Sequence, residues 1–298
     1  MPRLASASCL VLAALAVPAC GVNIDHEGYI EREEKRFPAE ALPDLHLYTF
    51  DGAVEIRAWD RPEVLVEIEK RGQNKEAVSK IQVIADRSGR RIQVEARHPS
   101  GRAVFVGFGS SRAPSARLIA TVPRKTNVLA RTGDGSIVAE RVEGRLELRT
   151  GDGAIRTVET SGELLAETVD GSIQIDEVAG RVEARTGDGT VRISGTPSVV
   201  RARTGDGSML LRIRRGAVMA EDWFATTDDG SVQVELPDGF NAEIEADPGS
   251  DGRARSDLTL VNVSGGTRDQ RTLRGRIGTG GRLLTLRTGD GTIRITNY

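Results

Sequence analysis

The chain has few aromatic residues, few cysteines and no excess of either charge, and each shortage excludes a class of protein. Aromatic residues make up 4% of the 298 residues, so the core has to be narrow and aliphatic. The two cysteines are Cys9 and Cys20, which leaves the rest of the chain without a disulfide framework, a cysteine metal site or a cysteine nucleophile. The formal net charge of −2 gives no basic excess, so we expect no nucleic-acid partner.

Long apolar runs are also missing, apart from one short run at the N-terminus. The run from Leu4 to Val17 is too short to remain as a membrane-spanning helix. It follows a positive residue and ends in the small-residue stretch VPAC, which is typical of a secretory signal. We therefore expect residues 1–19 to be a signal peptide and Cys20 to be the lipidated first residue of a bacterial lipoprotein. Ordinary cleavage after Ala19, which would give a soluble secreted or periplasmic protein, is the alternative.

The residues after Cys20 are polar and charged. We interpret residues 20–39 as a polar tether between the anchor and the folded part. A lipid on Cys20 would hold the protein on a membrane of the bacterial cell envelope, outside the cytoplasm.

An internal repeat is the strongest signal in the sequence. The pattern Thr-x-Asp-Gly-small-aliphatic occurs eight times, with threonines at Thr49, Thr132, Thr150, Thr168, Thr186, Thr204, Thr227 and Thr288. The five from Thr132 to Thr204 are spaced by 18 residues. A strict period of this length indicates a repeat architecture in which each unit packs on the next.

The segments around each Asp-Gly pair alternate between apolar and polar residues, as in RVEART and TVRI. A period of two predicts strands with one buried face. We therefore predict an all-β, parallel β-solenoid (β-helix) with rungs of about 18 residues over residues 40–298. Within it we expect an irregular part at 40–117, regular repeats at 118–240 and C-terminal rungs with a long loop at 241–298.

Three other repeat architectures make different demands on the residue pattern. A hexapeptide helix needs an aliphatic residue at every sixth position, but Asp188 and Ser194 follow Val182 at that spacing. A calcium β-roll needs an Asp turn in both halves of the coil, and the second half here has none. An antiparallel sandwich or barrel built from Asp-Gly hairpins stays open, because Asp-Gly is a hairpin signal.

The Asp-Gly pair that recurs at each turn predicts a structural role for its residues. Asp-Gly is the pair that a tight turn with positive φ prefers, so we expect the glycines to be turn residues. In the strict repeats they are Gly135, Gly153, Gly171, Gly189 and Gly207. The GDG letters are not a phosphate loop, because β-type residues rather than a helix follow them.

The turn aspartates are expected to stack in a column. Carboxylates about 4.8 Å apart repel each other by roughly 0.9 kcal/mol in water, so the column needs solvent or cations. Arginines three positions earlier, as at Arg149 and Arg185, are expected to neutralise it. A calcium ladder is the alternative. Its candidate ligands are Asp134, Asp152, Asp170, Asp188 and Asp206.

Several longer stretches carry a family resemblance. They are FDGAVEIRAWDRPEVLVEIEK (50–70), IATVPRKTNVLARTGDGSI (119–137), GRVEARTGDGTVRI, TDDGSVQVELP and LLTLRTGDGTIRI. Over about residues 40–298 the chain resembles the bacterial adhesin-type β-strand-repeat family, also called Toastrack. The resemblance implies a β-solenoid of the cell envelope, with some members linked to envelope-stress systems. It supplies no catalytic residues.

No catalytic constellation or cofactor motif stands out in the sequence. We expect an exported, lipid-anchored, non-enzymatic protein with an adhesin-like or scaffolding surface for an envelope protein or a glycan. The alternatives are a carbohydrate-active enzyme of the β-helix type, by analogy of fold alone, and a calcium-responsive adhesion module.

Overall fold

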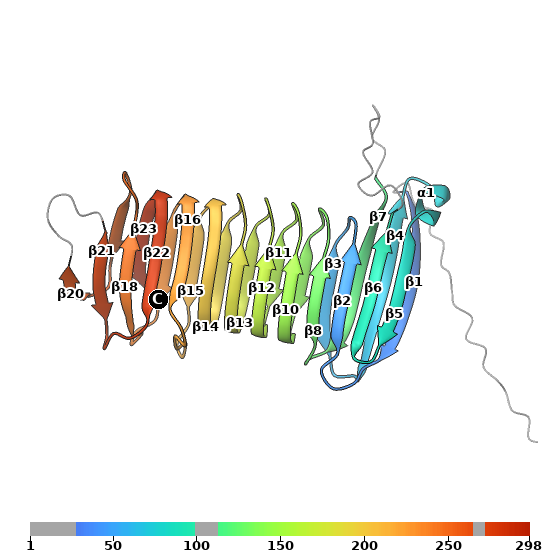
Figure 1. The fold of residues 1–298 in the computed structure, drawn as a ribbon, viewed down its shortest axis with the longest axis horizontal. Coiled ribbons are helices and arrows are strands. Elements are labelled where there is room, and N and C mark those ends of the chain that lie inside the picture. The colour runs from blue at the N-terminus through green and yellow to red at the C-terminus, as the bar shows by residue number, and fades with distance from the viewer. Residues whose placement is uncertain (1–27, 99–112, 265–271) are drawn as a thin grey trace, which may run out of the picture.

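The computed structural model describes residues 28–98, 113–264 and 272–298, which form an elongated rod of β-strands (Figure 1). The strands lie across the long axis and form two faces around one core. We call these faces sheet 1 and sheet 2. The strands β13 (Ile173–Arg185) and β14 (Val191–Asp206) run through both faces, so hydrogen bonds connect all strands into one network.

Sheet 1 contains the strands that lead into the Asp-Gly corners. From the N-terminal end of the rod its order is β5 (Gln82–Ser88), β6 (Arg91–Arg97), β2 (Asp44–Thr49), β8 (Asn127–Arg131), β10 (Glu143–Arg149), β12 (Ser161–Glu167), the second halves of β13 and β14, β16 (Trp223–Asp229), β22 (Leu283–Asp290), β18 (Ala242–Asp247), β21 (Leu273–Ile277) and β20 (Val261–Ser264).

Sheet 2 contains the strands that follow the corners. Its order is β1 (Tyr29–Pro38), β4 (Glu63–Gly72), β7 (Ser115–Pro123), β3 (Val54–Trp59), β9 (Ile137–Glu140), β11 (Ile155–Val158), the first halves of β13 and β14, β15 (Met209–Ile213), β17 (Val232–Leu236), β23 (Thr292–Asn297) and β19 (Arg253–Ser256).

Neighbouring rungs are parallel and keep the 18-residue register. Leu146 pairs with Leu164, and Leu164 pairs with Val182, so identical positions stack along the rod. The predicted parallel β-solenoid is confirmed. Among the described residues, antiparallel pairs occur only near the two ends of the rod, between β1, β4 and β7, between β5 and β6, and between β18, β21 and β20.

The core is aliphatic, as the shortage of aromatic residues predicts. Alternate side chains of each strand point inward, and Leu146, Leu148 and Val182 are at most 1% exposed. Trp223 is the exception among the largest buried side chains. Its indole N–H donates a hydrogen bond of 3.1 Å to the carbonyl oxygen of Ser198, so its one polar atom is satisfied.

The N-terminal end is closed by a strand where a tether was predicted. Residues 29–38 form β1, which pairs antiparallel with β4 along its whole length. Ion pairs explain why so charged a segment is a strand. Lys70 on β4 contacts Glu31 at 3.2 Å and Glu33 at 3.0 Å, and Glu69 contacts Arg32 at 2.8 Å. The charges also protect this edge from pairing with other chains. A short helix, α1 (Lys75–Ser79), follows β4, and its N-cap is Asn74.

The C-terminal end also differs from the prediction. The expected long loop contains an additional rung, in which β18 pairs with β22 and β19 pairs with β23. The antiparallel strands β21 and β20 then cover the end of sheet 1. The last strands of the chain, β22 and β23, are therefore inserted between β16–β17 and this outer rung (Figure 1).

Some predictions fall outside the described residues. The predicted signal peptide and Cys20 lie there. Within the described part of the chain, no helix has the length and apolar character needed to cross a membrane.

The ion pairs of β1 predict how stability responds to acid. Burial raises the pKa of Glu69, but its ion pairs with Arg32 and Arg71 outweigh burial, so the pKa lies below its usual value. Burial likewise raises the pKa of Glu33, and its ion pairs with Lys70 and Lys35 reverse the shift. The ion pairs of Glu69 and Glu33 therefore contribute fully to the unfolding free energy above a pH of about 4.5. This contribution is lost as the pH falls through the lowered pKa values of the two carboxyl groups.

We expect the unfolding free energy, measured by urea denaturation between pH 3 and pH 7, to decrease below about pH 4.5. Glu69→Gln should make this decrease shallower, because it removes one lowered carboxyl. Glu76→Gln, on the exposed side of α1, is the control. An unchanged acid slope in Glu69→Gln would show that these pairs do not hold β1.

Candidate functional site

The three repeated residues of each Asp-Gly corner have different surroundings: the threonine is buried, the glycine contacts the backbone of a neighbouring rung and the aspartate faces solvent. In the rung of β13, Thr186 is 7% exposed, Gly189 is buried and Asp188 is exposed. The threonine directly follows the strand of sheet 1, and the strand of sheet 2 starts two residues after the glycine. The repeat therefore places one exposed carboxylate and one buried hydroxyl in each rung.

The buried threonine hydroxyls connect successive rungs, a role that the sequence interpretation missed. Thr150 Oγ1 donates to the carbonyl oxygen of Gly135 at 2.7 Å, and Thr186 Oγ1 donates to Gly171 at 2.8 Å. The same hydrogen bond is made by Thr132, Thr168, Thr204, Thr227 and Thr288, each to the corner glycine of the preceding rung. The signal was present in the sequence, because this position holds threonine in all eight copies and never valine or isoleucine.

The corner glycines are needed for close contact between rungs, and the predicted positive φ is wrong for the strict repeats. A Cβ at Gly171 would overlap with the carbonyl oxygen of Gly153, and one at Gly189 would overlap with that of Gly171. Gly135, Gly153 and Gly207 are packed in the same way. Positive φ occurs instead at the second turn of the rungs, for example at Gly180 (φ 108°).

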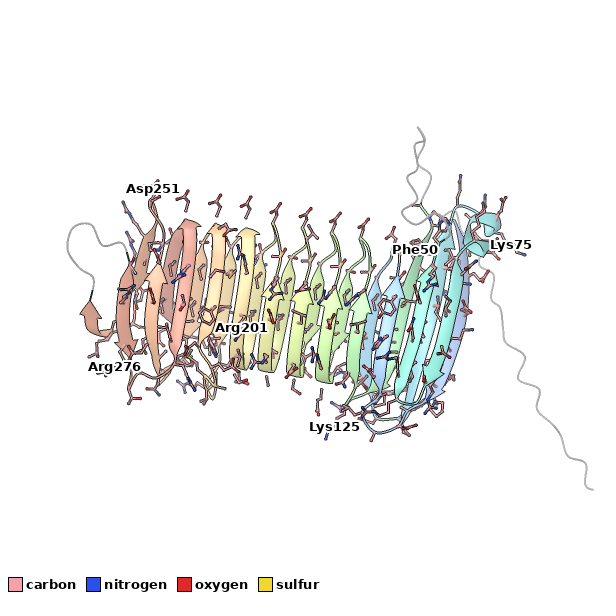
Figure 2. The ribbon with its side chains drawn as sticks, viewed as in Figure 1. Phe50, Lys75, Lys125, Arg201, Asp251 and Arg276 are labelled. Atoms are coloured by element: carbon pink, nitrogen blue, oxygen red, sulfur yellow. The ribbon has the colours of Figure 1, made fainter. Side chains whose placement is uncertain are left out.

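All eight aspartates form one column, although their sequence spacing is uneven. Thr132 donates to Gly52 and Thr288 donates to Gly230, so corners far apart in the chain occupy neighbouring rungs. Asp206 pairs in register with Asp229, and Asp229 with Asp290. Figure 2 shows the row of oxygen-tipped side chains along the upper edge of the rod. The spatial order is Asp51, Asp134, Asp152, Asp170, Asp188, Asp206, Asp229 and Asp290.

The N-terminal member of the column shows the effect of crowding. Burial raises the pKa of Asp51, and the neighbouring negative charge of Asp134 raises it further. Like charges that share a small region favour the neutral form of one of them. At this end of the column, Asp51 and Asp134 are therefore close enough for their negative charges to interact.

The arginine row does not neutralise this column, contrary to the prediction. Arg149 contacts Glu147 and Glu167, each at 3.1 Å, and Arg185 contacts Glu167 at 2.8 Å and also Glu183. The reason is geometric. Arginine and glutamate project from the same outer face of sheet 1, at positions i and i−2 or in register on the next rung, whereas the aspartate lies beyond the strand at the corner.

The predicted calcium ligands do not gather into a cluster. Asp134, Asp152, Asp170, Asp188 and Asp206 contribute one carboxylate per rung, and within the described residues no group of three or more potential ligands could hold a metal ion. Calcium takes six to eight oxygen ligands, so a single-file arrangement offers too few per ion.

The outer face of sheet 1 is hollowed near the C-terminal rungs. A hollow of about 370 Å³ is lined by Arg185, Arg201 and Phe224, among others. A second hollow of about 260 Å³ is lined by Asp228, Asp247 and Arg287, among others. Arg203 and Thr226 line both hollows. Figure 2 places Arg201 on the middle of the face turned to the viewer. We call Arg185, Arg201, Arg203, Phe224, Thr226 and Arg287 the Phe224 groove.

The sequence interpretation missed this groove. The available signal was the stretch WFATTDDG, where the outward positions carry phenylalanine and threonine in place of long charged side chains. A larger hollow of about 660 Å³ lies at the turns around Gly216, Gly239 and Gly281, above Met219 and Phe240.

The fold and its corners define the class of protein, a β-solenoid repeat protein with a Thr-x-Asp-Gly column. The family model described as Toastrack DUF4097 matches residues 43–296. The chain therefore belongs to the Toastrack DUF4097 family, as the resemblance of its motifs indicated. No curated protein matches it.

Solved structures with a similar chain path include three bacterial proteins. A candidate cell adhesion protein from Clostridium sporogenes is 13% identical with a TM-score of 0.30, covering 90% of this chain and 100% of its own. A candidate adhesin from Bacteroides fragilis is 9% identical with a TM-score of 0.34, covering 90% and 97%. A candidate lipid binding protein from Parabacteroides distasonis is 10% identical with a TM-score of 0.36, covering 90% and 96%. Similarity at these scores carries no information about ligand or activity.

The hydroxyl ladder predicts a specific loss of stability. Thr186→Val keeps the shape of the side chain but leaves the carbonyl of Gly171 without its hydroxyl donor, and should cost about 1–3 kcal/mol. Gly171→Ala should cost about 3 kcal/mol, because its new methyl group overlaps with backbone. Urea denaturation measures both, with Thr121→Val on the outer face of β7 as the control. Equal stability of Thr186→Val and Thr121→Val would contradict the ladder.

The negative charge of the column predicts the opposite effect at Asp188. Asp188→Asn removes repulsion from the aspartates above and below, each roughly 0.9 kcal/mol in water. The unfolding free energy should therefore rise by about 1 kcal/mol at low salt and by less in 0.5 M salt. Asp176→Asn is the control, because Asp176 lies 3.7 Å from Arg156 and should lose stability. A loss of stability in Asp188→Asn at low salt would contradict the repulsion.

Proposed function

We propose that the protein is exported, is held on a membrane of the bacterial envelope by a lipid on Cys20, and presents the solenoid as a non-enzymatic binding surface. The observation that carries the proposal is the distribution of the motif carboxylates. They lie one per rung along an exposed edge of the rod, whereas catalysis requires groups that converge on one place. A surface repeated along an axis is suited to a long partner, which meets the same groups at every rung.

The position of β1 supports an arrangement with respect to the membrane. The described part of the chain begins at residue 28, and residues 20–27 lie between it and the proposed anchor. Eight residues span at most about 28 Å when fully extended. The N-terminal cap would therefore stay close to the membrane, and the partner surface would extend away from it.

The exposure of the groove carboxylates favours binding over catalysis. A glycosidase needs one carboxylic acid with a raised pKa, which burial usually supplies. The side chain of Asp228 is 68% exposed, and Asp247 accepts a hydrogen bond of 3.2 Å from the amide of Gly249. Neither side chain is buried, so neither has the surroundings that such an acid requires. We therefore place the groove among binding sites and the protein among interaction proteins.

The anchor is tested by membrane fractionation of cells that express the wild-type chain or Cys20→Ala. We expect the wild type in the membrane fraction and the variant in the soluble exported fraction, because a lipid can be attached only to the thiol. Cys9→Ala, inside the predicted signal peptide, is the matched control and should fractionate like the wild type. Identical fractionation of Cys20→Ala and the wild type would contradict the anchor.

A further inference from the structure

One rung differs from its neighbours on the outer face of sheet 1. In register with Arg201 and Arg203 of β14, strand β16 carries Phe224 and Thr226. Phe224 is 40% exposed, although a phenylalanine gains about 1.5–3 kcal/mol when it is fully buried. Among the described residues, Phe224 is the one large hydrophobic side chain that is exposed and lines the groove. An aromatic ring is therefore presented to solvent directly beside the arginines of β14.

The small side chain of Thr226 opens a gap between two arginines. Arg203 precedes Thr226 in register and Arg287 follows it. The Cα atoms of the two arginines are therefore two rung spacings, or about 10 Å, apart on either side of the gap. The hollow of about 260 Å³ is lined by Thr226 and both arginines. A hydroxyl and two cationic side chains thus line one recess beside an aromatic ring.

These arginines are weakly engaged by the protein itself. Arg185 is held by Glu167 and Glu183, and Arg201 contacts Glu221 at 3.3 Å. By contrast, the one ion pair that Arg203 makes with a described residue is with Asp228, at 3.5 Å, and both side chains are more than 60% exposed. Arg287 makes no ion pair and no side-chain hydrogen bond within the described part of the chain. Exposed pairs of this kind are worth little, so both guanidinium groups can bind a ligand at small cost.

We propose that the Phe224 groove binds a polysaccharide that carries carboxylate groups, lying along the rod axis. The inference rests on the proposed function and names the ligand class of the binding surface. Arg203 and Arg287 bind sugar carboxylates, Thr226 supplies a hydroxyl, and Phe224 packs against the apolar face of a sugar ring. Three acidic side chains that line the same two hollows, Glu183, Asp228 and Asp247, accept hydrogen bonds from sugar hydroxyls.

The chemistry of the groove favours this ligand for three reasons. Guanidinium groups bind carboxylates in a bidentate geometry, which gives them specificity for uronate sugars. A rung spacing of about 4.8 Å is comparable with the length of one sugar ring, so a polymer can meet successive rungs in step. Finally, a protein partner needs an apolar interface centre, and the groove provides only one exposed aromatic ring.

The test is isothermal titration calorimetry of the purified protein with an oligogalacturonate. Its fully methyl-esterified form and an oligo-aspartate of equal charge are the matched probes. We expect the oligogalacturonate to bind and the ester to bind at least about tenfold more weakly, because it lacks the charge-assisted hydrogen bonds. Arg203→Gln and Arg287→Gln should each weaken binding about tenfold. Arg192→Gln, at an exposed position on sheet 2, should leave it unchanged.

Phe224→Ser separates sugar binding from simple anion binding. It should weaken the oligogalacturonate and leave any residual oligo-aspartate binding unchanged, because only the sugar presents an apolar face to the ring. Circular dichroism of every variant checks that the solenoid is folded. Phe224 and both arginines are surface residues, so folding should be retained.

Three results would overturn the inference. They are no binding of the oligogalacturonate, equal binding of its ester or of oligo-aspartate, and binding that Arg203→Gln and Arg287→Gln leave intact. None of these results would contradict the proposed lipid anchor, which fractionation of Cys20→Ala tests separately. Shortening of the bound oligomer, measured by its chain length after incubation, would overturn the non-enzymatic function instead.

Discussion

The contact between the backbone corners of successive rungs is the constraint on which the rest of the structure depends. Each corner glycine lies so close to the glycine carbonyl of the rung before it that no side chain fits between them. The threonine hydroxyl of the next rung then donates to that buried carbonyl, as Thr204 does to Gly189 at 2.8 Å. An unsatisfied buried carbonyl is costly, so threonine and glycine are required together. The aspartate between them has no room inside and faces solvent.

This corner contact also explains how the fold accommodates large insertions. Residues between Gly52 and Thr132, and between Gly230 and Thr288, leave the stack and return to the adjacent rung. Both insertions build the ends of the rod, where β1, β4 and β5 close one end and β20 and β21 close the other (Figure 1). A solenoid needs such caps because its terminal rungs expose strand edges. The same corner contact therefore accounts for both the regular centre and the irregular ends of the rod.

Sequence periodicity could predict what depends on neighbours in the chain. The strands, the solenoid and the stacking of Asp134 to Asp206 all follow from local pattern and spacing. It could not predict β1, because ion pairs with distant Lys70 and Glu69 make that strand. It also misplaced the partners of Arg149 and Arg185, since only the strand geometry shows that glutamates lie closer than the corner aspartates. The Phe224 groove depends on the register of β14, β16 and β22, which no single repeat reveals.

The single corner column determines the spacing of every exposed group, including the arginines of the Phe224 groove. A distance measurement between spin labels at Asp51→Cys and Asp290→Cys tests it most directly, because these residues are the two ends of the column. Seven rung steps of about 4.8 Å predict a narrow distribution centred near 34 Å, allowing for label length. The matched pair Asp51→Cys and Asp206→Cys should give about 24 Å. A broad distribution, or equal distances for the two pairs, would contradict the column and the surfaces built on it.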